Sequence, residues 1–207
     1  MHFSIMAHDL PIRGVVVAYV VALLLGGCLR GVPDPSLSAR DAQYMALVPN
    51  WELDPQFQRY EVDYRTSEKP GTVVIYTQDR LLYLVMPDGK AIRYGVGVGN
   101  EAFGWTGQMD IARKAEWPSW TPPAEMLERW PHLRPRAGGM AGGPENPLGA
   151  RALYLHKDGR DTLYRIHGTN EPESIGQASS SGCIRMRNVD VIDLFNRIKV
   201  GAKVVVI

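Results

Sequence analysis

Cysteine is scarce in this sequence, whose 207 residues hold only Cys28 and Cys183. Two cysteines allow at most one disulfide, and a modification of Cys28, considered below, would leave Cys183 without a partner. An excess of one charge is also lacking, because 23 basic and 22 acidic side chains give a formal net charge of +1. This balance offers no basic surface of the kind that nucleic-acid binding needs, so nucleic acid is excluded as a partner.

Other signatures of common function classes are missing too. The sequence has no internal repeats, no heptads and no glycine-rich phosphate loop between a strand and a helix. His132, His156 and His167 are scattered and form no ligand pair with a cysteine at the spacing of zinc sites, so no metal site is predicted. The hydrophobic content of 45% suits one globular domain with a core, and 21 Gly and 15 Pro favour a structure rich in strands and turns.

The N-terminus has the organisation of a secretory signal. Positively charged Arg13 is followed by the uncharged apolar run GVVVAYVVALLLGG, which is short for a transmembrane helix and typical of a signal-peptide core. The run ends in Leu25-Gly26-Gly27-Cys28, which resembles the lipobox of bacterial lipoproteins. We expect residues 1–28 to be a signal peptide whose lipobox-like end makes Cys28 the lipidated residue. The alternative is an ordinary secretory signal that is cut nearby.

The expected location follows from this signal. Both kinds of signal predict export from the cytoplasm, and a lipoprotein signal also predicts anchoring to a membrane through N-terminal lipid. Leu29 rather than Asp follows Cys28, which resembles the outer-membrane class of lipoproteins. We therefore expect a periplasmic protein that is lipid-anchored to the outer membrane.

The remaining chain divides into two parts. Residues 29–70 are polar and interrupted by proline, which predicts a tether and a lead-in, with aromatic residues such as Trp51 that can pack onto the domain. Residues 71–207 carry short runs rich in β-branched and aromatic residues, separated by turn signals at Pro87–Lys90 and Lys157–Arg160. The fold class is therefore mainly β. The expected strands are TVVIYT, LLYLVM, AIRYGVGV, RALYLH, TLYRIH and the end from Lys203 to Ile207.

One helix and one long loop are expected within this domain. The helix begins at Asn188 as its cap, shows an apolar stripe through VDVIDLFNRI and stops at Gly201, close to the segment with Cys183. The stretch from Trp117 to Ala150 is too rich in Pro and Gly for regular structure, and a loop this long in a compact domain is usually functional. Its three tryptophans argue against a disordered insertion.

The segment from Ile166 to Met186 holds the candidate chemistry, because it carries His167 and Cys183 in an otherwise polar loop. An imidazole within reach of a thiol can take its proton and later return it to a leaving amine. Gly182 permits a tight turn before the thiol, where backbone N–H groups can face a developing oxyanion. Arg185 shares the face of Cys183 in an extended segment and can hold a carboxylate, or it forms a structural ion pair with Asp190 or Asp193.

These residues resemble the signature of the L,D-transpeptidase catalytic domain (YkuD-type, ErfK/YbiS-like). That signature is a His-Gly pair, a polar loop, and Ser-His-Gly-Cys followed by an aliphatic residue and Arg. The chain has His167-Gly168 and then Ser180-Ser181-Gly182-Cys183-Ile184-Arg185, with Asn188 close behind, and the likeness extends over residues 71–207. Ser181 departs from the pattern, because the family has histidine there.

The resemblance implies a fold, a reaction and a site. The fold is a β-sandwich with a helix packed near the catalytic cysteine loop, and no metal or cofactor is needed. Cys183 attacks the peptidoglycan tetrapeptide stem and releases D-Ala, His167 acts as base and acid, and a backbone carbonyl near Gly168 orients it. A monomer and the following substrate-binding residues are also expected: Arg185, Ser181, Asn188 and, in a lid over the peptide, Trp120.

The acceptor amine stays open, as does the reaction class. The acceptor can be a second stem peptide, a lysine of a wall-anchored lipoprotein or a free D-amino acid. A thiol hydrolase (an L,D-carboxypeptidase) on stem peptides uses the same first half-reaction. A third possibility is a non-catalytic, lipid-anchored wall-binding protein that keeps the fold.

Overall fold

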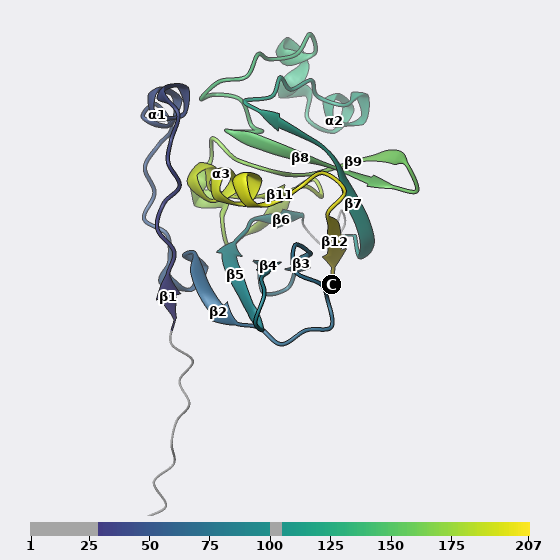
Figure 1. Ribbon diagram of the computed structural model, residues 1–207. Helices are drawn as coiled ribbons and strands as arrows, with labels where there is room; N and C mark the ends of the chain where they lie inside the picture. Colours follow the sequence, from purple (N-terminus) through teal and green to yellow (C-terminus); the bar gives the residue numbers. More distant parts are fainter. Residues whose placement is uncertain (1–28, 100–104) are drawn as a thin grey trace, which may run out of the picture.

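The computed structural model describes residues 29–99 and 105–207 (Figure 1). The predicted signal peptide and Cys28 therefore lie outside the described residues. A ten-stranded sheet dominates the domain, with the order β1-β2-β5-β4-β3-β12-β7-β8-β9-β11, and a small parallel sheet joins β10 to β6. The strands are β1 (Arg30–Gly31), β2 (Tyr60–Asp63), β3 (Val73–Tyr76), β4 (Leu81–Val85), β5 (Lys90–Gly95), β6 (Val98–Gly99), β7 (Gly107–Glu116), β8 (Arg151–Lys157), β9 (Arg160–His167), β10 (Ala178–Ser180), β11 (Ile184–Arg185) and β12 (Lys203–Val206).

Three α-helices and three short 3-10 helices complete the described chain. The α-helices are α1 (Ala39–Met45), α2 (Ala124–Arg129) and α3 (Asn188–Arg197), and the 3-10 helices are η1 (Pro55–Phe57), η2 (Pro131–Arg136) and η3 (Pro172–Ser174). None of the helices in residues 29–99 and 105–207 is long and apolar enough to cross a membrane. The mainly β class predicted from the sequence is confirmed.

One hydrophobic core joins the two halves of the large sheet. The half around β3, β4 and β5 contributes Ile75, Leu82 and Tyr94, and the half around β7, β8 and β9 contributes residues such as Ile111 and Leu153, all fully buried. Strand β12 connects the halves, because it pairs in parallel with β3 and antiparallel with β7. The core therefore lies between two sheet halves, as expected for a sandwich.

Local sequence explains the hairpins. The turns between β4 and β5 and between β8 and β9 each place an Asp-Gly pair at positive φ: Asp88 at 61° and Gly89 at 67°, and Asp158 at 51° and Gly159 at 76°. This is the geometry of a type I′ turn, whose twist matches that of the strands it joins. Both turns were predicted from the sequence. The β8–β9 hairpin matters most, since it ends at His167.

The predicted helix α3 packs on the sheet but begins differently from the prediction. Its apolar stripe is buried through Val191, Ile192 and Leu194. Asn188 is its first helical residue rather than its cap, and the cap position is occupied by Arg187, which makes no side-chain capping hydrogen bond. The amide of Asn188 is used instead to bind backbone groups outside the helix, described below.

The segment from 29 to 70 is folded onto the domain rather than a free tether. Strands β1 and β2 extend the edge of the sheet beyond β5, and β1 begins two residues after Cys28. Helix α1 is fixed by Asp41, whose carboxylate accepts hydrogen bonds at 2.8 Å from both Arg151 terminal nitrogens and from Trp117 Nε1. No local pattern in the sequence indicates these contacts, because the partners of Asp41 are 76 and 110 residues away.

The stretch 117–150, here named the lid segment, contains more regular structure than predicted. It forms α2 and η2 and is closed at its base by hydrogen bonds between the backbones of Trp120 and Met140. The Asn146 side chain donates to the carbonyls of Pro118 and Ala141, which ties the two ends of the lid segment together. In Figure 1 this segment lies over β8 and β9, so it covers the end of the sheet that carries the candidate site.

Candidate active site

Parallel pairing of β9 and β11 brings the two halves of the candidate site together. The register places Arg185 opposite His167 and Ile184 opposite Ile166. The backbone N–H of Met186 also donates to the carbonyl of His167 at 2.8 Å. Cys183 directly precedes β11, so the polar loop between His167 and Cys183 folds back as the sequence suggested.

His167 is held as a neutral imidazole with a defined tautomer. It is buried, and its Nδ1 lies 2.6 Å from the carbonyl oxygen of Gly168. A carbonyl can only accept, so Nδ1 carries the proton and Nε2 is left as the basic nitrogen. Burial lowers the pKa of His167 to about 4, with the nearby charges of Arg185 and Arg165 acting in the same direction and the hydrogen bond to Gly168 opposing.

The loop that orients His167 is fixed by backbone hydrogen bonds. The N–H of Gly168 donates to the carbonyl of Arg151 at 3.0 Å. Asn188 Oδ1 accepts from the backbone of Ala150 and Thr169, and its Nδ2 donates to the Thr169 carbonyl at 2.9 Å. A Cβ on Gly168 would lie 2.2 Å from Asn188 Oδ1, so this close approach requires glycine.

Asn188 is therefore a correction to the sequence prediction, which made it a substrate-binding residue. It is 7% exposed, and both polar atoms of its amide are occupied by backbone groups. A side chain satisfied in this way has no capacity left to bind a peptide in the cavities beside Cys183. Its effect on the site is indirect, through the position of the Gly168–Thr169 peptide.

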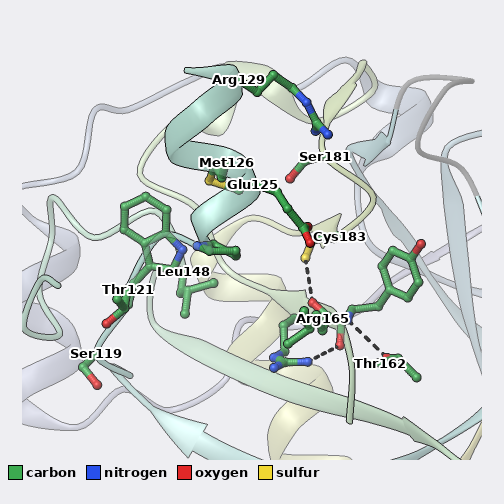
Figure 2. A pocket seen from close by; sticks show the side chains of 14 residues that line it. Ser119, Thr121, Glu125, Met126, Arg129, Leu148, Thr162, Arg165, Ser181 and Cys183 are labelled. Carbon is green, nitrogen blue, oxygen red and sulfur yellow. Dashed lines mark hydrogen bonds between the residues drawn. The ribbon is translucent and has the colours of Figure 1, made fainter. Parts of the chain in front are cut away.

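Cys183 presents a partly exposed thiol, and its Sγ lies 3.9 Å from the carbonyl oxygen of Leu163 (Figure 2). Burial raises the pKa of this thiol, although the positive charges of Arg165 and Arg185 oppose the rise. The thiol is thus protonated near neutral pH, while the imidazole is unprotonated. This pair of protonation states suits a nucleophile that needs a base at the moment of attack.

The turn before the thiol has the geometry that a glycine allows. Gly182 has φ of 110°, which side chains rarely adopt. The hydroxyl of Ser180 donates to the Cys183 carbonyl at 2.6 Å and accepts from the Gly182 N–H at 3.2 Å. From the sequence, Ser181 was expected to bind substrate, and the backbone N–H groups here were expected to face an oxyanion. The structure gives the loop bonds to Ser180, and the Gly182 N–H is already engaged.

Two cavities meet at Cys183. The cavity on the His167 side has a volume of about 300 Å³, and the cavity on the α2 side, drawn in Figure 2, has a volume of about 420 Å³. Cys183 and Ser181 line both, and so does Trp120 of the lid segment. A thiol between two cavities can be approached by one molecule from each side.

Arg185 lines the His167-side cavity and forms an ion pair with Glu171 at 2.9 Å. Asp190 and Asp193, the alternative partners considered from the sequence, are bound by other residues: Arg59 and Arg187 pair with Asp190, and Arg197 pairs with Asp193. Arg185 is therefore not a structural partner of α3. The Arg185 guanidinium lies at the cavity, where it is already paired with the Glu171 carboxylate.

Sequence reasoning missed several residues at the site. Arg165 and Leu163 line the α2-side cavity from β9, Glu171 follows the His167 loop, and Glu125, Met126 and Arg129 project from α2. The alternation of side chains along YRIH places Arg165 on the face of His167, which is a signal that could have found it. Leu163 had no such signal, because it has φ of 62° at a register shift between β8 and β9 that breaks the alternation. The α2 residues had no such signal. Within residues 29–99 and 105–207, no cluster of side chains could hold a metal ion.

Comparison with known proteins agrees with this arrangement. Residues 70–206 match the YkuD family, described as the L,D-transpeptidase catalytic domain. A protein of Escherichia coli K12 named Probable L,D-transpeptidase YbiS is 37% identical over 144 residues, which are 65% of this chain and 43% of that protein. The chain thus aligns with less than half the length of this curated relative.

Solved structures share the fold. A chain described as a Probable carnitine operon oxidoreductase from Brucella melitensis is 47% identical, with a TM-score of 0.52, and the match covers 75% of this chain and 96% of that one. An L,D-transpeptidase from Mycobacterium smegmatis has a TM-score of 0.50 at 13% identity, covering 74% and 68%. The latter likeness concerns the fold alone. Since the family match spans the β9–β11 pair, the lid segment and both cavities, this chain belongs to the YkuD family of L,D-transpeptidase catalytic domains.

Proposed function

We propose that this protein is an L,D-transpeptidase of peptidoglycan that works through a thioester on Cys183. The observation that carries the proposal is the position of Cys183 between two cavities, one of which is also lined by His167, whose Nδ1 is bound to the Gly168 carbonyl. A group-transfer enzyme needs room for a donor and an acceptor around one nucleophile. A tetrapeptide stem supplies the acyl group, and an amine receives it.

The two pKa shifts determine how the first step proceeds. The lowered pKa of His167 and the raised pKa of Cys183 favour a neutral imidazole and a neutral thiol over an ion pair. Proton transfer from sulfur to Nε2 therefore accompanies attack of the sulfur on the donor carbonyl. A C–S bond forms, and the bond to the terminal D-Ala breaks. His167 returns its proton to the D-Ala amine as it leaves.

The second step reverses the roles of the same groups. The acceptor amine attacks the thioester carbon, the C–S bond breaks, and a proton lost by the amine returns to the sulfur through His167. Arg185 and Arg136, which line the His167-side cavity, provide positive charge for carboxylates of the donor stem. Trp120 and Met126 of the lid segment line both cavities and supply apolar surface around the reacting bond.

The proposed function is tested with muropeptides. The full chain is incubated with disaccharide-tetrapeptide, with and without an added amine, and the products are resolved by mass. Released D-Ala together with cross-linked dimers or amine adducts is expected. Tripeptide as the sole product would replace transfer with hydrolysis. Unchanged tetrapeptide, together with a Cys183 that no strained β-lactam acylates, would leave only a non-catalytic wall-binding role.

The proposed location is the periplasmic face of the outer membrane, with lipid on Cys28. This rests on the lipobox-like sequence and on Leu29 after the cysteine. Because β1 begins at Arg30, such an anchor would leave almost no free tether, and the catalytic domain would stand directly on the membrane surface. A stem peptide of the adjacent wall, or a lysine of a wall-anchored lipoprotein, would then have to approach the membrane to react. A monomer is sufficient for this site, since one chain supplies both His167 and Cys183.

A further inference from the structure

Helix α1 contributes one half of a buried ion pair whose other half lies on the strand next to His167. Asp41 lies in α1, outside residues 70–206, which match the family. Its two carboxylate oxygens accept hydrogen bonds of 2.8 Å from the two terminal nitrogens of Arg151. Arg151 is the first residue of β8, which pairs with β9, the strand that ends at His167. A bidentate pair of this kind fixes both the position and the orientation of a guanidinium.

The main chain of Arg151 is connected to the imidazole of His167 by two hydrogen bonds. The Arg151 carbonyl accepts from the N–H of Gly168 at 3.0 Å, and the Gly168 carbonyl accepts from Nδ1 of His167 at 2.6 Å. The guanidinium of Arg151 also donates to the Ala150 carbonyl at 2.8 Å, which holds this side chain against its own backbone. Displacement of Arg151 therefore moves the peptide that sets the tautomer and the orientation of the His167 ring.

Two glycines bring the backbone around the start of β8 into direct contact with this peptide. A Cβ on Gly149 would lie 2.4 Å from the backbone nitrogen of Thr169, and a Cβ on Gly168 would lie 2.8 Å from the backbone nitrogen of Ala150. Backbone atoms thus meet without a side chain between them that could adjust its rotamer. Since close-packed groups transmit strain, a shift of residues 149–151 is passed on to the peptide after His167.

Asp41 is the carboxylate that fixes Arg151. Glu116 is the other carboxylate within 4.0 Å of the Arg151 guanidinium in the described chain, and its contact of 4.0 Å comes from a side chain that is 60% exposed. A contact of this length on a solvated side chain is weak and screened. Asp41 is itself held in place, because it forms a capping box with Ser38 and accepts from Trp117 Nε1 at 2.8 Å. Glu116 therefore does not duplicate its role.

We propose that Asp41 is a positioning residue for His167 and acts through Arg151. Asp41 lines neither cavity beside Cys183, so its effect on the reaction is indirect. The inference rests on the proposed function, because it takes His167 as the base that accepts the Cys183 proton. It deepens that function by assigning part of the catalytic geometry to a helix outside the family match. Residues 29–69 then support the base in addition to leading into the catalytic domain.

The test measures acylation of the full chain by a strained β-lactam near neutral pH, followed by mass spectrometry. Asp41→Asn should lower the acylation rate about 10- to 50-fold, because a misoriented base loses much of its assistance while the thiol remains. The matched control is Glu68→Gln. Both Glu68 carboxylate oxygens accept from Lys203 Nζ at 2.9 Å, so this pair also joins residues 29–69 to the sheet, but neither residue lines a cavity beside Cys183. The control should acylate within about twofold of wild type.

A double-mutant cycle distinguishes positioning of the base from a general loss of structure. In the His167→Ala background, Asp41→Asn should change the acylation rate by less than about twofold, because no imidazole remains to be oriented. A loss of the same size in both backgrounds would overturn the proposal, since Asp41 would then support only the fold. A wild-type rate in Asp41→Asn would overturn it as well.

The ¹⁵N chemical shifts of the His167 ring, which report its tautomer, provide a spectroscopic readout. Wild type and Glu68→Gln should show one neutral tautomer with the proton on Nδ1, because the Gly168 carbonyl accepts it. Asp41→Asn should show a mixture in which Nε2 is also protonated, since the carbonyl is displaced. A single Nδ1-protonated tautomer in Asp41→Asn would contradict the proposal.

Ser38→Ala is a milder variant that carries the cycle if Asp41→Asn does not fold. It removes a hydroxyl that donates to Asp41 Oδ2 at 2.8 Å and leaves the pair with Arg151 in place. Acylation should slow about three- to fivefold, because the loss of one hydrogen bond releases Asp41 only in part. No loss, or an equal loss in the His167→Ala background, would overturn the proposal. Failure of wild type to release D-Ala from the tetrapeptide would instead overturn the proposed function, while the β-lactam cycle would still measure the coupling of Asp41 to His167.

Discussion

The imidazole of His167 donates its Nδ1 proton to the carbonyl oxygen of the adjacent residue, Gly168, across 2.6 Å. A carbonyl orients the ring and fixes its tautomer as an acidic side chain would, but it adds no full negative charge. Burial therefore dominates and keeps the pKa of His167 at about 4. The base stays unprotonated at neutral pH and retains little affinity for a proton.

The pKa of His167 determines the pH at which the acylation rate declines on the acidic side. A base whose pKa is lowered from 6.5 to about 4 stays active below the pH at which an ordinary histidine is protonated. We expect kcat/KM for acylation to stay level as the pH falls through 6 and to decline only near pH 4, measured by β-lactam acylation of the full chain. A decline centred near 6.5 would show that the imidazole is exposed to water during the reaction.

Substitution of the two reacting residues should have unequal effects. Cys183→Ala should abolish acylation, because Cys183 is the only thiol in residues 29–99 and 105–207. His167→Ala should slow acylation by about 10²- to 10⁴-fold near neutral pH, the usual range for general-base assistance. The deficit should shrink with rising pH as the thiolate forms unaided. Wild-type rates in His167→Ala, followed by mass spectrometry of the acylated chain, would remove His167 from the mechanism.

Two neighbouring serines provide a matched comparison in the loop before Cys183. Ser180 is buried and bonds both the Cys183 carbonyl and the Gly182 N–H, whereas Ser181 lines the two cavities. Ser180→Ala should slow acylation about tenfold, since about 1–2 kcal/mol of loop hydrogen bonding is lost. Ser181→Ala should change it less than about threefold. The reverse order would mean that Ser181 takes part in proton transfer.

Local signals in the sequence predicted much of this fold. Strands β3 and β4 are continuous apolar or aromatic runs, β8 contains one in its centre, and both Asp-Gly turns form where expected. Strand β7 was missed because only Met109 and Ile111 of its ten residues are buried, and its second half is mostly charged and exposed or half-buried. Short edge strands such as β1 have too few residues to show any period. Their pairing depends on contacts with residues about 30 positions away.

The sequence predicted some residues of the candidate site and not others, again because only short local patterns can be recognised in a sequence. Motif residues near Cys183 could be named because their chemistry is visible in one short segment. Asn188 was misjudged because an amide at a helix start looks the same whether it caps that helix or binds the Thr169 backbone. The sequence around Glu125 forms no motif that indicates a function. Only the fold of the lid segment brings it to the cavity of Cys183.

The folded segment before the family domain leads to a prediction about stability. Asp41 and Arg151 are both buried, with side chains 3% and 5% exposed, and two hydrogen bonds of 2.8 Å join them. Although burial opposes it, hydrogen bonds from Arg151, Ser38 and Trp117 hold the pKa of Asp41 well below its ordinary value. Asp41→Asn should lower the free energy of unfolding by about 3–5 kcal/mol, because it leaves the Arg151 charge buried without a partner.

The lowered pKa of Asp41 also determines how the free energy of unfolding changes with pH. A carboxyl with a lowered pKa in the folded state contributes stability that is full above its unfolded pKa of about 4 and is lost as the pH falls below it. Urea unfolding at several pH values should therefore show wild type losing stability on acidification below pH 4, with a shallower loss in Asp41→Asn. Asp63→Asn serves as the control, since its ion pair with Lys90 is exposed to solvent and screened, and its loss should change the free energy of unfolding far less than Asp41→Asn does. Equal effects of the two substitutions would show that α1 does not hold Arg151 and Trp117 in solution, and would favour the tether that the sequence predicted within residues 29–70.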